Sequence, residues 1–194
     1  MMRKLLFNLA YLQKPVWDTG ISPPELLEFI SSHKPGRALD LGCGTGTNAI
    51  YLAGKGFDVT AIDIAPTALN LAREKAAKAG VKVRWLLADV LAPPRLEPFD
   101  LIYDRGCYHG VRRQHAAGYA AAVKRLSQPG TRLLILAGNA KEAGGGPPRV
   151  KEEELRADFS PDWDFEWLRE THFDTFDADR KGALAWSALL RRRP

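Results

Sequence analysis

The sequence predicts an α/β protein with a mostly parallel β-sheet. Short apolar segments alternate with helix-forming segments along most of the chain, and a glycine-rich loop joins the first such segment to a helix. The last two strand-like segments follow one another without a helix between them. Alternation is typical of parallel strands with crossover helices, whereas two successive strands pair antiparallel. We therefore expect seven strands, an antiparallel pair at one sheet edge, and helices on both faces.

Each expected strand is a short run of apolar or β-branched residues bounded by turn-forming residues. The seven strands are expected at residues 37–42, 58–64, 81–90, 99–106, 131–139, 164–174 and 183–193. The helices between them are rich in helix formers and end at glycine or proline. They are expected at residues 47–56, 65–80, 116–130 and 150–159, with a loop at 140–148 and a turn at 177–182.

The composition is that of a globular protein of one domain. The chain has 194 residues, of which 45% are hydrophobic and 26% are charged, so we expect a single domain over residues 1–194. Two cysteines cannot form a disulfide framework, which favours a cytoplasmic location. Residues 1–15 imitate a signal peptide, but Asn8 interrupts the apolar run, so a docking helix is expected there. No apolar stretch approaches the roughly 20 residues of a spanning helix, and no membrane partner is expected.

The net charge of +5 raises the question of nucleic acid. The basic residues are scattered, and their densest run is the terminal LLRRRP, which suits a solvated tail better than a phosphate-binding patch. No zinc-finger spacing or RNA-recognition sequence occurs. We expect neither a nucleic-acid partner nor a bound metal, and the oligomeric state has no readable signal.

The glycine-rich loop favours one nucleotide-like cofactor over another. Gly42, Cys43, Gly44, Thr45 and Gly46 form G-x-G-x-G, whereas a dinucleotide fingerprint needs its third glycine where Thr47 stands. Asp40 precedes the first glycine by two residues, an unsuitable place for an anion beside a pyrophosphate. S-adenosylmethionine has no pyrophosphate and carries an ammonium and a sulfonium group. The loop therefore favours this cofactor and argues against a dehydrogenase.

Two further acids support this interpretation. Asp63 ends the second expected strand, where a carboxylate can accept both ribose hydroxyls. Asp89, followed by Val90, ends the third and is placed to face the adenine amino group. Each acid alone could equally be a helix cap or a turn residue. Three acids near successive strand ends make that alternative hard to sustain.

From about Trp17 to the C-terminus the chain resembles class I S-adenosylmethionine-dependent methyltransferases. The segments LDLGCGTGTNAIYLAGKGFDVTAID and LLADVL carry the resemblance. It implies a Rossmann-like sheet of seven strands with its last strand antiparallel. It also implies that the three glycines line the methionine part of the cofactor, with Cys43 and Thr45 between them. The remaining cofactor contacts that it implies are Asp40 at the amino group, Asp63 and Ile64 at the ribose, Asp89 and Val90 at the adenine, and Asp104.

The fourth expected strand bears on the methyl acceptor. FDLIYDRGCYHGV lacks the Asn-Pro-Pro-Tyr-like run of adenine or amide N-methyltransferases. Its Asp-Arg-Gly resembles the thiopurine and thiol methyltransferases and their bacterial relatives, which methylate sulfur, selenium or halide in small acceptors. PVWDTGISPP resembles the segment that these proteins fold over the cofactor, so residues 1–35 are expected to cover the site, with Trp17 on the cofactor or anchoring the N-terminal helix. One departure is Ala116, where the family often has an arginine that Arg112 or Arg113 could replace.

The expected reaction is methyl transfer to a small molecule, with S-adenosylhomocysteine as product. A thiolate or halide needs little acid–base help, whereas a less acidic acceptor would need a base, for which His109 and Tyr108 are candidates. His109 could also simply pack or cap a helix. Asp104 and Arg105 could pair with each other to shape the pocket or contact the substrate. The alternatives are an O- or N-methyltransferase of a small metabolite and a non-catalytic cofactor-binding module.

Overall fold

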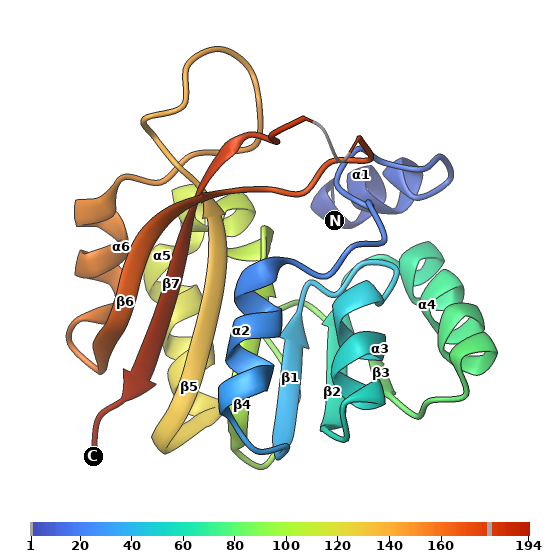
Figure 1. Cartoon of the computed structure of the whole chain (residues 1–194), viewed down its shortest axis with the longest axis horizontal. Coiled ribbons are helices and arrows are strands. Elements are labelled where there is room, and N and C mark those ends of the chain that lie inside the picture. The colour runs from blue at the N-terminus through green and yellow to red at the C-terminus, as the bar shows by residue number, and fades with distance from the viewer. Residues whose placement is uncertain (1, 178–179) are drawn as a thin grey trace. The chain divides into compact units, whose positions relative to one another are not determined.

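The computed structural model describes residues 2–177 and 180–194, which form two compact units, residues 1–94 and 95–194. The expectation of a single domain is not tested by this division and stays a prediction. The expected turn at 177–182 contains Ala178 and Asp179, which lie outside the described residues. Each unit is an α/β arrangement with its own strands and helices (Figure 1).

The first unit holds three parallel strands in the order β3-β2-β1. Its elements are α1 (Met2–Ala10), α2 (Pro24–Ser32), β1 (Arg37–Leu41), α3 (Thr47–Gly54), β2 (Asp58–Asp63), α4 (Pro66–Ala79) and β3 (Arg84–Leu87). α3 contacts β1 and β2, α4 contacts β2 and β3, and both helices lie beside these strands in Figure 1. The parallel register brings the carboxyl ends of all three strands to one edge.

The second unit holds four strands in the order β4-β5-β7-β6. Its elements are β4 (Phe99–Arg105), α5 (Cys107–Arg125), β5 (Ser127–Gly138), α6 (Glu152–Phe159), β6 (Trp163–His172) and β7 (Leu184–Arg192). β4 and β5 are parallel, whereas β7 runs antiparallel to both β5 and β6. The predicted antiparallel last strand is therefore confirmed, and the expected antiparallel pair, β7 and β6, lies at one end of the strand order.

Several expected elements have different bounds. The strand expected at residues 81–90 is only Arg84–Leu87, and the strand expected from residue 131 begins at Ser127. The helix expected from Ala116 begins at Cys107. It is interrupted at His115, whose φ of −141° is not helical, and the predicted part is the stretch after this break. Pro129 and Gly130, expected to close this helix, lie within β5. Glycine and aromatic residues in the first half of α5 weaken its helical signal. The helix at Pro24–Ser32, which Pro23 precedes, was not predicted individually. The sequence predicts only that residues 1–35 form a helical segment over the cofactor site.

Candidate functional site: a glycine loop and two strand ends

The glycine loop after β1 needs glycine at each of its three positions. Gly42, Gly44 and Gly46 have φ values of 69°, 54° and 81°, in the left-handed region that other residues rarely adopt. At Gly46 an added Cβ would also lie 2.5 Å from Cη2 of Trp85 and 2.9 Å from Cβ of Ala72. The third glycine therefore permits the start of α3 to pack closely against β3 and α4, one position earlier than in a dinucleotide fingerprint.

Asp63 holds this loop at the end of β2. One carboxylate oxygen accepts a hydrogen bond from the backbone N–H of Gly44 and the other from that of Ala65, both at 2.8 Å. Burial raises the pKa of Asp63, and the two backbone donors offset part of that effect. A carboxylate oxygen can accept more than one hydrogen bond, so Asp63 keeps acceptor capacity for a pair of hydroxyls. This chemistry fits the ribose of an adenosine cofactor.

Apart from Asp104, which belongs to the second unit, the other predicted cofactor residues lie in the same unit. Asp40 is buried within β1, where it pairs in register with Ala61. Asp89 lies two residues beyond the end of β3, and its carboxylate accepts a hydrogen bond from Leu91 N at 3.0 Å. Asp89 therefore stabilises a turn near the strand end. Val90 beside it is buried. Ile64 directly follows β2 and is half-buried.

Thr45 has a role that the motif does not reveal. Its hydroxyl donates to Oδ1 of Asp18 at 2.6 Å and accepts from Nζ of Lys75 at 2.5 Å, and the side chain is buried. These bonds attach the glycine loop to the N-terminal segment and to α4. The half-buried Cys43 precedes Thr45, and its thiol donates weakly to the carbonyl of Gly44. Asp18 was not predicted as a site residue, and its position directly after Trp17 is the only local signal.

Tyr11 is the second residue that sequence reasoning missed. Its phenol is only 8% exposed, and Nε1 of Trp17 donates a hydrogen bond to its oxygen at 3.1 Å. The two rings pack edge to face, with their centroids 6.3 Å apart. Trp17 itself is 45% exposed, and in this structure its indole anchors Tyr11 through this hydrogen bond. Whether Trp17 covers the cofactor is a separate prediction that these contacts do not test.

In the second unit, Asp104 holds the start of α5. Its carboxylate accepts hydrogen bonds from the backbone N–H groups of Cys107 and Tyr108, both at 2.9 Å, and from the hydroxyl of Tyr119 at 2.6 Å. Asp104 is completely buried, and this burial raises its pKa to about 6 despite the stabilising donors. The two carboxylate oxygens of Asp104, held by these donors in the interior, therefore anchor the start of α5. The expected contacts of Asp104 with cofactor or substrate stay predictions.

Arg105, the next residue of β4, has a different partner. Its Nη2 lies 2.6 Å from Oδ2 of Asp174, and its guanidinium lies over the ring of Phe173, 5.3 Å from the centroid. The two charged side chains are only 11% and 9% exposed, so they form a buried ion pair. The expected pairing of Arg105 with Asp104 is therefore replaced by a pairing with the segment that follows β6.

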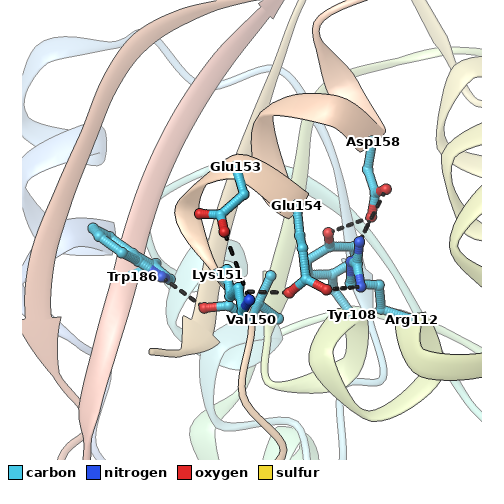
Figure 2. A network of polar contacts seen from close by, with 8 residues as sticks. All are labelled: Tyr108, Arg112, Val150, Lys151, Glu153, Glu154, Asp158 and Trp186. Carbon is cyan, nitrogen blue, oxygen red and sulfur yellow. Dashed lines mark hydrogen bonds and ion pairs between the residues drawn. The ribbon is translucent and has the colours of Figure 1, made fainter. Parts of the chain in front are cut away.

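Tyr108 belongs to a polar network between α5 and α6 (Figure 2). Its hydroxyl donates to Oδ2 of Asp158 at 2.6 Å, and Nε of Arg112 donates to the same oxygen at 2.7 Å. Arg112 also reaches Oε1 of Glu154 at 3.0 Å. Burial and the nearby Asp158 raise the pKa of Tyr108 further above its ordinary value. Tyr108 therefore donates to α6 in this structure, and its predicted role as a base stays a prediction. Arg112 is bonded to α6, while Arg113 is exposed.

His109 has a fixed protonation state. The backbone N–H of Gly138, at the end of β5, donates to its Nδ1 at 2.8 Å, so the ring proton must lie on Nε2. Burial, assisted by the charge of Arg105, lowers the pKa of His109 to about 4. Its edge lies against Phe173 and beside Gly106. At neutral pH His109 is therefore a hydrogen-bond donor, and its only acceptor nitrogen is already used.

The basic C-terminal run is partly neutralised. Arg192 pairs with Asp162, and Nε of Arg193 lies 2.8 Å from Oδ1 of Asp164. Over residues 2–177 and 180–194, the structure brings together no cluster of three acids, histidines or cysteines suited to a metal ion. Within the same ranges no helix is both long and apolar enough to cross a membrane.

Comparison with known proteins decides the family. Residues 38–130 match the family model described as a methyltransferase domain. The 2-heptyl-1-hydroxyquinolin-4(1H)-one methyltransferase of Mycobacteroides abscessus is 33% identical over 156 residues, which are 77% of this chain and 69% of that protein. The chain belongs to the class I S-adenosylmethionine-dependent methyltransferases. Its activity is therefore S-adenosylmethionine-dependent methyl transfer, as the sequence predicted.

The names of two further similar proteins refer to sulfur compounds. Thiocyanate methyltransferase 1 of Arabidopsis thaliana is 29% identical over 136 residues, 68% of this chain and 60% of that protein. A solved structure described as "Conversion of a Disulfide Bond into a Thioacetal Group during Echinomycin Biosynthesis" is 28% identical, with a TM-score of 0.85 over 98% of this chain and 93% of that one. This similarity confirms the predicted Rossmann-like methyltransferase fold. The chain thus spans about 60% of the length of the plant relative.

Proposed function

We propose that this methyltransferase acts on a small acceptor that arrives already ionised, above all a thiolate or another soft nucleophile such as a selenium or tellurium species or a halide. The observation that carries the proposal is the hydrogen bond from Gly138 N to Nδ1 of His109. It occupies the lone pair that a histidine base would need. The other candidate base, Tyr108, donates its hydroxyl proton to Asp158.

The chemistry of the acceptor then follows from its own acidity. S-adenosylmethionine supplies an activated methyl group that a nucleophile can take without any proton transfer. A thiol as acidic as that of cysteine, with a pKa near 8.5, is ionised to about a few per cent at neutral pH, whereas an aliphatic alcohol is not. The role left for His109 is to donate its Nε2–H to an anionic acceptor, which positions the nucleophile. The sulfur-related names of two relatives agree with this acceptor class.

One alternative acceptor has specific support. The relative from Mycobacteroides abscessus is named for a 1-hydroxyquinolin-4-one. The hydroxyl of such a compound is far more acidic than that of an alcohol, so it would also reach the enzyme ionised. An O-methyltransferase of an acidic hydroxyl is therefore the second candidate function.

A screen with matched acceptors tests the proposal. The purified protein is given S-adenosylmethionine with thiophenol, phenol, benzyl mercaptan, benzyl alcohol, iodide or a 1-hydroxyquinolin-4-one, and S-adenosylhomocysteine formation is measured. We expect turnover of the thiols and of iodide and none of benzyl alcohol. Turnover of benzyl alcohol with no turnover of any ionised acceptor would contradict the proposal. Turnover of the hydroxyquinolone alone would select the second candidate.

A further inference from the structure

The side chain of Tyr11 lies directly against the middle glycine of the loop. A Cβ added to Gly44 would be 2.6 Å from Oη of Tyr11 and 3.5 Å from Cζ. The ring is buried in a small apolar cluster with Ala65 and Ala68, at the start of α4. A loop glycine of this kind lets a ligand approach the backbone closely. In this structure the phenol of Tyr11 fills the space that faces Gly44.

The same phenol lies close to Asp63. After burial, the charge of Asp63 is the largest cause of the raised pKa of Tyr11. Asp63 is only 6% exposed, although a ribose would have to reach its carboxylate. Gly44 and Asp63 are joined by the 2.8 Å hydrogen bond described above, so the phenol lies over one continuous surface. Tyr11 therefore lies against the loop glycine expected at the methionine part of the cofactor and near the carboxylate expected at its ribose.

The helix that directly precedes Tyr11, α1, is short and has several exposed apolar side chains. α1 has nine residues, too few for a stable isolated helix. It is attached through Oδ1 of Asn8, which accepts from Thr67 N at 3.0 Å, and the residues after it through Asp18, which accepts from Thr45. The opposite side of the segment is exposed, at Leu5, Leu6, Leu9 and Leu12. Segments with little buried apolar surface open at low free-energy cost.

We propose that Tyr11 is a displaceable plug of the cofactor site, which S-adenosylmethionine must push aside to reach Gly44 and Asp63. The N-terminal segment then sets cofactor affinity, because binding includes the cost of detaching Tyr11. A protein whose competent state is only partly populated binds its ligand more weakly by that fraction. The proposal rests on the predicted place of the cofactor and not on the identity of the methyl acceptor.

Calorimetry with S-adenosylhomocysteine tests the plug. Tyr11→Ala removes the phenol, so we expect binding about three- to tenfold tighter than that of the wild type. Leu12→Ala, at a neighbouring position that is 67% exposed, is the matched control and should bind like the wild type. Tyr11→Phe keeps the ring but loses the oxygen that accepts from Trp17, and should give an intermediate affinity. Unchanged or weaker binding by Tyr11→Ala would overturn the proposal, weaker binding making Tyr11 a cofactor contact instead.

Binding kinetics supply a second readout. In the wild type the observed association rate should level off as S-adenosylhomocysteine is increased, because detachment of Tyr11 becomes limiting, whereas in Tyr11→Ala it should rise linearly. A linear rise in both would contradict displacement. Circular dichroism and thermal unfolding verify that each variant is folded. Neither experiment uses an acceptor, so failure here is distinguishable from failure of the acceptor screen.

Discussion

The backbone N–H of Gly138 donates to Nδ1 of His109 over 2.8 Å, which joins the end of β5 to the first turn of α5. Gly138 also accepts, through its carbonyl, a hydrogen bond from Val150 N at 2.8 Å. The same glycine therefore fixes the tautomer of His109 and closes the loop of residues 140–149. An added Cβ at Gly138 would lie 2.3 Å from the carbonyl oxygen of Pro148, so only glycine fits there.

The first prediction concerns stability against pH. His109 has a pKa of about 4 in the fold and an ordinary value of 6.5, so between these values the unfolded chain binds more protons and stability rises with pH. Asp104 has a pKa of about 6 against 3.8, so between these values the folded protein binds more protons and stability falls as pH rises. The two effects oppose each other between about pH 4 and 6.

Replacing His109 should leave the opposite pH dependence that comes from Asp104. His109→Gln keeps an acceptor for Gly138 N–H but cannot titrate, so its free energy of unfolding should fall from pH 4.5 to 6 relative to the wild type. Each unit of pKa difference corresponds to about 1.4 kcal/mol, which places the change in a measurable range. Urea unfolding at several pH values checks it. An identical pH dependence in His109→Gln and the wild type would show that His109 is not held neutral by the fold.

The second prediction concerns the network between α5 and α6. Asp158 accepts from both Tyr108 and Arg112, and its side chain is 12% exposed. Asp158→Ala should lower the free energy of unfolding by about 1–3 kcal/mol, because it leaves both donors without their acceptor. Glu153→Ala is the control, since its 3.8 Å pair with Lys151 is largely exposed and should contribute about 0–1 kcal/mol. Equal losses in the two variants would contradict this assignment.

The third prediction separates two glycines of the first unit. Gly46→Ala should be destabilised, because its positive φ strains any other residue by on the order of 1–3 kcal/mol and its Cβ would meet Trp85. Gly54→Ala, at the end of α3, has open space around the new methyl group and should be neutral or gain up to about 1 kcal/mol. Thermal unfolding compares them. A tolerated Gly46→Ala would mean that the loop geometry is wrong.

The fourth prediction concerns cofactor binding. Asp63→Ala should weaken S-adenosylhomocysteine at least tenfold, which corresponds to about 1.4 kcal/mol, because it removes the acceptor for the ribose and releases Gly44. Asp58→Ala changes an exposed acid at the opposite end of the same strand and should bind normally. Calorimetry measures the affinity of both variants for S-adenosylhomocysteine. Wild-type affinity in Asp63→Ala would place the ribose elsewhere.

The sequence predicts most of the strands and the cofactor motif because both are local signals. The glycine spacing and the strand-end acid at Asp63 each depend on a few neighbouring residues. Each expected strand overlaps an observed one, although the third is shorter than expected, at Arg84–Leu87. The start of α5 is missed because its stability comes from Asp104, whose carboxylate accepts from the first turn in place of a recognisable cap. Helix formers appear only beyond the break at His115.

The contacts of the candidate site are less predictable, since they join distant parts of the chain. Tyr11 meets Gly44, and Arg105 pairs with Asp174, 69 residues further on. A tyrosine in a short apolar helix or an aspartate in a loop carries no local sign of such a partner. The tautomer of His109 likewise depends on a backbone group 29 residues away. Chemistry-bearing residues are thus identifiable from the sequence, whereas their protonation states are not.

The most direct test of the account compares pH–rate profiles for two thiol acceptors of different acidity. If His109 supplies no base, the limb of kcat/KM against pH should follow the pKa of each thiol and move when the acceptor is changed. His109→Gln should keep the same limb at a lower rate. A limb that stays at one pH for both thiols and vanishes in His109→Gln would contradict the account and establish His109 as the general base.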